Sequence, residues 1–193
     1  LSFLPEVLML LRGGFPKMVM LAEFSSDDED ELMNRLRGFQ SGMKGIGLVA
    51  RVMRSEREAE KYRTIRRQSF KLLHEHTKDR ETAPFIDDVI VRPEFLPEFL
   101  PKLSVILEPY KSKMTYTIAG HPGDGNFHVI PLMDLKDPEV RALIPKISEE
   151  VYDLVLKYGG SITAEHNDGL IRTPYLEKMY GREVAKLFEE VKH

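Results

Sequence analysis

Short apolar runs alternate with longer charged segments along most of the chain. Residues 17–24, 48–53 and 85–91 form compact apolar runs of the length that favours β-strands. Residues 31–39 follow an acidic stretch rich in helix-capping residue types, and residues 55–77 carry apolar side chains at helical spacing within a charged sequence. The first part of the chain is therefore predicted to hold three strands separated by two helices.

The second part of the chain combines helices with a pair of adjacent strands. Residues 93–108 are rich in Leu and begin with a proline, as helices often do. Residues 114–120 and 126–133 have strand-like patterns and flank a Gly-rich turn, so they are predicted to form a hairpin. Residues 137–158 are amphipathic and residues 175–191 have a helical pattern, which adds two further helices.

The order of these elements indicates the fold class. Residues 159–168 are predicted to be a short strand or a loop, so strands and helices mix throughout. We therefore expect an α+β fold, with an antiparallel sheet and helices on one face. The repeated β-α-β rhythm suggests ferredoxin-like halves. The length of 193 residues suits one domain.

Composition narrows the possible partners. The formal net charge is −3, with no basic surplus to neutralise phosphates, so nucleic acid is not an expected partner. The chain has no cysteine, which restricts any metal site to His, Asp and Glu ligands and fits a reducing, cytoplasmic location. Neither a G-x-G-x-x-G nor a Walker motif is present, so no nucleotide is expected to be held in those two ways.

Two clusters carry candidate chemistry. The first, HPGDGNFH, places His121 and His128 on either side of a Gly-Asp-Gly turn, where a hairpin can bring both imidazoles to one ion. The second, GGSITAEHNDG, places Glu165 and His166 side by side after a glycine pair. Two imidazoles and one carboxylate suit zinc, or ferrous iron or manganese, and leave positions open for a substrate. His74 and His76, on a charged helix, are interpreted as solvated.

From the residues alone, other functions stay open. A metal-dependent hydrolase needs the same ligand types, although the metalloprotease pattern H-E-x-x-H is absent. A non-catalytic metal-binding interaction domain would also account for the clusters. Dye reduction that depends on a substrate would distinguish a dehydrogenase from both alternatives.

The two clusters resemble the motifs of one enzyme family. Gly120-HPGDGNFH is similar to the pattern G-H-x-G-D-G-N-x-H, and GGSITAEHNDG is similar to G-G-x-x-x-x-E-H-G-x-G. Both patterns are typical of the FAD-linked oxidase C-terminal domain, found in D-lactate dehydrogenase, the glycolate oxidase flavoprotein subunit and D-2-hydroxyglutarate dehydrogenase. The segments YRTIRRQSF and DDVIVRPEFLPEF extend the resemblance upstream.

The resemblance implies a role for each motif residue. It implies that His121, His128 and Glu165 bind a divalent metal, zinc before iron or manganese. It implies that His166 is the catalytic base that takes the hydroxyl proton of a small 2-hydroxy acid. Asn126 is expected to face the flavin or the substrate.

Substrate selection depends on positions upstream and inside the second strand of the hairpin. Arg66 is expected to bind the substrate carboxylate, with Arg63 or Arg67 as alternatives in the same basic helix. By the resemblance, Phe70 and Ile130 look like the positions at which 2-hydroxyglutarate enzymes of the family carry polar residues. These apolar residues favour an acid of the D-lactate or glycolate type.

The resemblance also implies a domain organisation and a cofactor. Residues 1–193 are expected to be the substrate- and metal-binding C-terminal (cap) domain of an FAD-dependent 2-hydroxy-acid dehydrogenase or oxidase. FAD would be held mainly by an N-terminal FAD-binding domain of the same protein, which nothing in this sequence resembles. We therefore expect a fragment that lacks most of the flavin site.

Overall fold

The computed structural model describes residues 18–53, 55–76 and 80–192, apart from the side chains of residues 65, 66 and 69–76. The chain divides into two compact units, residues 1–68 and 69–193, and each is described by itself.

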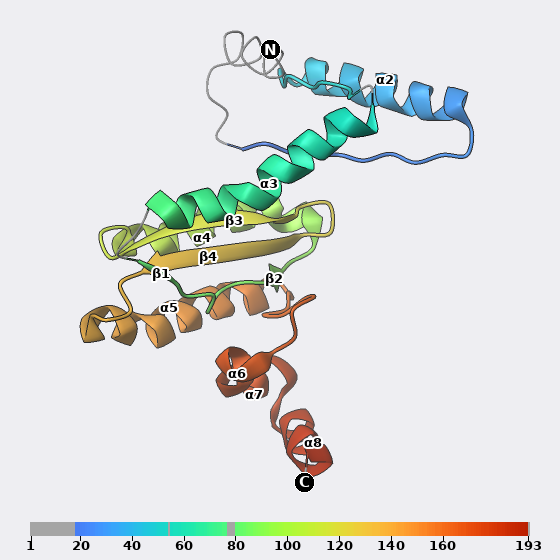
Figure 1. Ribbon diagram of the computed structural model, residues 1–193. Coiled ribbons are helices and arrows are strands. Elements are labelled where there is room, and N and C mark those ends of the chain that lie inside the picture. Colours follow the sequence, from blue (N-terminus) through green and yellow to red (C-terminus); the bar gives the residue numbers. More distant parts are fainter. Residues whose placement is uncertain (1–17, 54, 77–79, 193) are drawn as a thin grey trace. The chain divides into compact units, whose positions relative to one another are not determined.

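The first unit is built from helices. Helix α2 (Glu29–Gly45) begins at Asp28, whose carboxylate accepts hydrogen bonds from the amides of Asp30 and Glu31. Helix α3 (Glu56–His76) confirms the predicted helix 55–77 and continues past the unit boundary. In Figure 1 both helices are labelled in the blue-to-green part of the chain.

The two strands predicted in the first unit are wrong. Residues 18–26 and 48–53 are irregular, and residue 17 lies outside the described part. Met18, Val19 and Val49 are largely exposed, so these runs have no apolar layer to pack on. A strand also needs a neighbour for its backbone hydrogen bonds, and none of the described residues pairs with either run.

The second unit contains a four-stranded antiparallel sheet centred on β4 (Asn126–Met133). Strand β3 (Met114–His121) pairs with β4 over its whole length, which confirms the predicted hairpin. The other edge of β4 pairs with two short strands, β1 (Glu81–Thr82) and β2 (Val89–Ile90). The predicted strand 85–91 is therefore reduced to β2.

Two helices cover one face of this sheet. The chain passes from β2 through a 3₁₀ turn (Pro93–Phe95) into α4 (Leu96–Leu107), and a further 3₁₀ turn (Glu108–Tyr110) leads to β3. Helix α5 (Pro138–Lys157) follows β4. The two helices contact each other and contribute buried side chains to one core, among them Phe99, Leu103, Leu107, Ile147, Val151 and Val155.

The last piece of the sheet is a single bridge between Ile90 and Ser161. It completes the order strand, helix, strand, strand, helix, strand of a ferredoxin-like unit. The α+β fold with an antiparallel sheet is thus confirmed (Figure 1).

The two faces of β4 have different roles. Phe127, Val129 and Met133 belong to the core cluster with α4 and α5. Because side chains alternate along a strand, Asn126 and His128 lie on the opposite face. The candidate chemistry therefore projects from the side of the sheet that the two core helices leave free.

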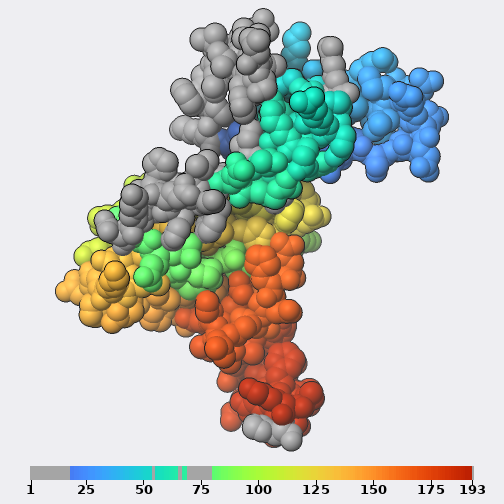
Figure 2. Space-filling model, in the orientation of Figure 1, coloured from blue at the N-terminus to red at the C-terminus, as the bar shows by residue number. Residues whose placement is uncertain are grey.

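Short helices complete the second unit: α6 (Gly169–Arg172), a 3₁₀ turn (Thr173–Tyr175), α7 (Leu176–Tyr180) and α8 (Arg182–Lys192). The single helix predicted over residues 175–191 is interrupted at Gly181, whose φ is 81°. Helix α8 forms the red end of the second unit in Figure 2, and its Leu187, Phe188 and Val191 are exposed. Among the described residues, none of the helices has the length and apolar character needed to span a membrane.

Candidate metal and substrate site

The β3–β4 hairpin brings two of the expected ligands together. In its register His121 pairs with Asn126 and Ala119 pairs with His128. The imidazole rings of His121 and His128 end with centroids 5.8 Å apart and planes at 90°. The pairing expected from the Gly-Asp-Gly turn is therefore present in the structure.

Gly125 fixes this hairpin to the end of β2. Its φ is 75°, and a Cβ at this position would lie 1.8 Å from the carbonyl oxygen of Val91. Its own carbonyl accepts a hydrogen bond from the Val91 amide at 3.1 Å. Only glycine fits both the backbone angle and the close approach, so the turn sequence sets where the two histidines lie.

The second cluster is held in place by the buried carboxylate of Asp88, the residue directly before β2. Asp88 is fully buried, and its Oδ2 accepts hydrogen bonds from the amides of Ala164, Glu165 and His166 at 2.8, 3.0 and 2.9 Å. Its Oδ1 accepts a hydrogen bond from the side chain of Asn126 at 3.0 Å. One carboxylate thus shapes the loop that carries two of the site residues.

The environment of Asp88 favours its ionised form. Burial on its own would raise the pKa of this carboxyl, but hydrogen bonds from the loop amides and from Asn126 outweigh it and lower the pKa. Asp88 also has a φ of 65°, which Asp tolerates better than most residues. This backbone turn explains why the predicted strand 85–91 begins only at Val89.

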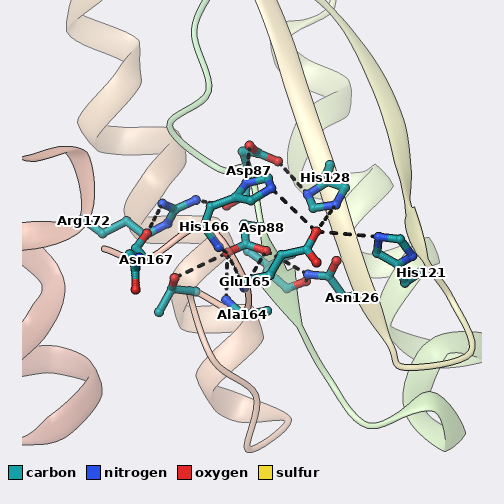
Figure 3. A network of polar contacts seen from close by, with 12 residues as sticks. Asp87, Asp88, His121, Asn126, His128, Ala164, Glu165, His166, Asn167 and Arg172 are labelled. Atoms are coloured by element: carbon teal, nitrogen blue, oxygen red, sulfur yellow. Dashed lines mark hydrogen bonds and ion pairs between the residues drawn. The ribbon is translucent and has the colours of Figure 1, made fainter. Parts of the chain in front are cut away.

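The Glu165 carboxylate lies among three imidazoles (Figure 3). Its Oε1 is 2.9 Å from His128 Nε2 and 3.6 Å from the Nε2 atoms of both His121 and His166. Three nitrogens and one oxygen therefore converge from a hairpin and a loop that are far apart in sequence.

Asp87 contacts the Nδ1 atoms of two of these imidazoles. Its Oδ1 is 3.1 Å from His128 Nδ1 and its Oδ2 is 3.2 Å from His166 Nδ1. The two rings stack with centroids 4.7 Å apart and planes at 12°. The guanidinium of Arg172, itself buried, donates to the backbone carbonyl of Asp87 and to that of Asn167. Asp87 is therefore fixed through both its side chain and its backbone.

The donor set fits a divalent metal. Asp88, His128, Glu165 and His166 have possible ligand atoms within 4.8 Å of one another. Both Asp88 oxygens, however, already accept several hydrogen bonds, so this carboxylate is a poor choice of ligand. The imidazoles around Glu165 are better candidates, because nitrogen and carboxylate ligands suit zinc, iron and manganese.

An open cavity of about 290 Å³ adjoins these groups. It is lined by Ile90, His121, Asp124, Asn126, Ala164 and Glu165. The amide nitrogen of Asn126 donates to Asp88 and to the Val89 carbonyl, whereas its Oδ1 is buried and has no hydrogen-bond partner among the described residues. Asn126 thus supports the loop, and its expected contact with flavin or substrate stays a prediction.

The expected substrate arginine is not tested by the site geometry. Arg66 belongs to α3 in the first unit, and its side chain lies outside the described part. Phe70, which entered the substrate argument, also has an undescribed side chain. Of the alternatives, Arg63 pairs with Glu23, Glu56 and Glu60, and Arg67 pairs with Glu60.

Sequence reasoning missed Asp87, Asp88 and Arg172. The signal for the two acids was present, because adjacent carboxylates interrupt an otherwise apolar run, FIDDVIV. Because buried charges need partners, this pair could have indicated a polar network, but that prediction was not made. Arg172 gave no comparable signal in its surface-like segment.

Comparison with known proteins adds an independent observation. The family described as FAD linked oxidases, C-terminal domain, matches residues 16–193. The chain is 30% identical over 167 residues to D-2-hydroxyglutarate dehydrogenase of Pseudomonas putida, covering 84% of this chain and 16% of that protein.

Two further relatives carry other names. The chain is 33% identical over 64 residues to glycolate oxidase subunit GlcD of Bacillus subtilis, covering 33% of this chain and 14% of that protein. It is 30% identical over 107 residues to the mitochondrial D-lactate dehydrogenase [cytochrome] of Arabidopsis thaliana, covering 55% of this chain and 18% of that protein. The chain thus spans less than a fifth of the length of each of these three relatives.

Proposed function

The chain belongs to the family of FAD-linked oxidase C-terminal domains, and from this membership we propose that it binds the substrate and metal of an FAD-dependent 2-hydroxy-acid dehydrogenase. The observation that carries the proposal is the convergence of three imidazole Nε2 atoms on the Glu165 carboxylate.

His121, His128 and Glu165 are the proposed metal ligands. Zinc is the first candidate, with iron or manganese as alternatives of similar ligand preference. A bound divalent metal would supply Lewis-acid stabilisation of charge on the substrate hydroxyl oxygen. The open cavity beside His121 and Glu165 leaves room for a small acid to approach these residues.

His166 is the proposed catalytic base. A neutral imidazole that donates through Nδ1 to Asp87 keeps a lone pair on Nε2, the atom that takes the hydroxyl proton. Loss of the hydroxyl proton would let the α-carbon give up its hydrogen with the electron pair as hydride, which turns the 2-hydroxy acid into a 2-oxo acid. FAD is the proposed hydride acceptor and would supply the redox chemistry.

The identity of the substrate acid is proposed from the apolar side chain of Ile130. Ile130 lies on the same face of β4 as His128, where it offers no hydrogen bond to a second carboxylate. We propose a substrate of the D-lactate or glycolate type, with Arg66 binding its carboxylate. The similarity to D-2-hydroxyglutarate dehydrogenases makes that acid the necessary comparison.

The proposed partner is an N-terminal FAD-binding domain of the same protein. The chain covers only 16%, 14% and 18% of the three relatives, which leaves length for further domains in those proteins. The test therefore uses the gene product that carries this chain, purified with its flavin. It is mixed anaerobically with D-lactate, glycolate or D-2-hydroxyglutarate while flavin absorbance is followed.

We expect a 2-hydroxy acid to bleach the flavin, with D-lactate or glycolate faster than D-2-hydroxyglutarate. His166→Asn should slow bleaching by about 10²- to 10⁴-fold, the usual worth of a general base. Asp134→Asn, a surface change in the same unit, should leave the rate unchanged. Unchanged bleaching in His166→Asn would remove that residue from the reaction. Ester or peptide turnover without bleaching would replace the dehydrogenase with a hydrolase.

A further inference from the structure

We propose that Asp87 is a positioning residue that sets the tautomers of two imidazoles at once, those of His128 and His166. One carboxylate would thereby prepare both a metal ligand and the catalytic base. This inference rests on the proposed function and names a residue that the motif resemblance leaves without a role.

The contacts of Asp87 divide evenly between the two rings. Each of its carboxylate oxygens meets one Nδ1 atom, at 3.1 Å for His128 and at 3.2 Å for His166. The Asp87 side chain is 12% exposed, so little water competes for either oxygen. Arg172 binds the Asp87 backbone carbonyl and thereby limits movement of the carboxylate.

The chemistry of the carboxylate determines the proton positions. An ionised carboxylate accepts hydrogen bonds and donates none, so each Nδ1 that it contacts must carry a proton. A neutral imidazole protonated on Nδ1 has its lone pair on Nε2. Asp87 therefore selects the Nδ1–H tautomer in both rings.

The arrangement of the two rings determines where their Nε2 lone pairs point. The His128 and His166 rings stack with planes at 12°, and both Nδ1 atoms contact Asp87, so their Nε2 atoms face the same region. They are 2.9 and 3.6 Å from Glu165 Oε1. The two Nε2 lone pairs and the Glu165 carboxylate repel one another unless a hydrogen-bond donor or a cation lies between them. The arrangement therefore favours binding of a cation.

Replacing the Asp87 carboxylate with an amide tests its hydrogen bonding without changing its packing. Asp87→Asn keeps nearly the same shape but offers one acceptor and one donor. One of the two rings must then accept a hydrogen bond at Nδ1 and carry its proton on Nε2. That proton would point at Glu165 and block the nitrogen as a ligand or a base.

The test measures zinc affinity and imidazole tautomers in the purified chain. Zinc affinity is obtained by competition with a chromogenic chelator, and tautomers are read from the ¹⁵N shifts of the ring nitrogens without metal, at a pH well above the usual imidazole range. Asp134→Asn is the matched control, because Asp134 is an exposed carboxylate outside the site whose Oδ1 accepts a hydrogen bond from the Lys136 amide. Circular dichroism confirms that each variant is folded.

We expect both rings of the wild-type chain to be protonated on Nδ1. In Asp87→Asn we expect one ring to change to the Nε2–H form. If that ring is the proposed metal ligand His128, zinc affinity should also fall about 10- to 100-fold, as for other residues that orient metal ligands. Asp134→Asn should change zinc affinity less than threefold and leave both tautomers in place.

Each contrary result has a separate meaning. Wild-type tautomers with Nε2–H on either ring overturn the inference, and this measurement needs no variant if Asp87→Asn fails to fold. Unchanged tautomers and zinc affinity in Asp87→Asn overturn it as well. If the wild-type chain binds no zinc but Asp87→Asn still changes one tautomer, positioning by Asp87 stands and the metal in the proposed function fails.

Discussion

Replacing Asp88 with Asn tests whether one buried carboxylate holds the loop that carries Glu165 and His166. Asn has nearly the same size and tolerates the φ of 65° found at this position, so the backbone and the packing are preserved. What changes is the acceptor, because an amide presents one oxygen and an NH₂ group where the carboxylate presents two charged oxygens.

The magnitude follows from the contacts of the two oxygens. Three loop amides donate to Oδ2 at 2.8 to 3.0 Å, and Asn126 donates to Oδ1 at 3.0 Å. A hydrogen bond to a charged group stabilises by about 1.5–3 kcal/mol and a neutral one by about 0.5–1.5 kcal/mol. Converting the three amide bonds to neutral ones and losing the bond from Asn126, with partial relief from water around the exposed loop, costs about 3–5 kcal/mol.

Urea unfolding of the chain, followed by circular dichroism, measures this loss. The control Asp134→Asn removes a charge that accepts one surface amide bond and should cost less than about 0.5 kcal/mol. A loss below about 0.5 kcal/mol in Asp88→Asn would refute the account of the loop.

The pH dependence gives a second check on the same variant. The pKa of Asp88 is lowered in the folded chain, so its stabilisation is present above the unfolded pKa of about 3.9. It is lost as the pH falls through the folded value. The difference in stability between wild type and Asp88→Asn should therefore shrink below about pH 4, and a difference that stays constant there would contradict the charge argument.

Other changes test the hairpin and the core. Gly125→Ala should destabilise the chain by at least about 3 kcal/mol in urea unfolding, because its Cβ would lie 1.8 Å from the Val91 carbonyl oxygen. The control Gly42→Ala has nothing near its Cβ and should be neutral or stabilising. Ile147→Ala should cost about 2–5 kcal/mol because the side chain is fully buried against the sheet, and a loss below 1 kcal/mol would place it outside the core. Tyr152→Phe should cost about 1–2 kcal/mol through the lost hydrogen bond to the Phe85 carbonyl. Burial raises the pKa of Tyr152 to about 12, so a late phase in the alkaline absorbance titration should be missing from that variant.

The sequence predicted the elements whose signals are local. The α+β class, the long helices and the hairpin followed from periodicity and turn residues, and the Gly-Asp-Gly turn correctly indicated that His121 and His128 meet. The runs at 17–24 and 48–53 looked like strands for the same local reason. They do not form strands, because pairing depends on a neighbouring strand that local composition does not reveal.

The supporting network could not be derived from local signals. Asp87 lies 41 residues from His128 and 79 residues from His166, and Asp88 lies 76 residues from Ala164. The adjacent acids in an apolar run were a signal that went unused, and only the fold shows which groups they bind. The candidate ligand residues could thus be named from the motifs, whereas their orientation could not.

The metal content of the purified chain tests the central claim most directly. The chain is incubated with zinc, manganese or ferrous iron, freed of loosely bound ions and measured by plasma mass spectrometry. Glu165→Gln is compared with Glu177→Gln, a change at an exposed carboxylate in the same unit. The account predicts about one metal ion per chain in wild type and Glu177→Gln, and a near-complete loss in Glu165→Gln. A wild-type chain that retains none of the three metals, or a Glu165→Gln variant that retains as much as wild type, would contradict it.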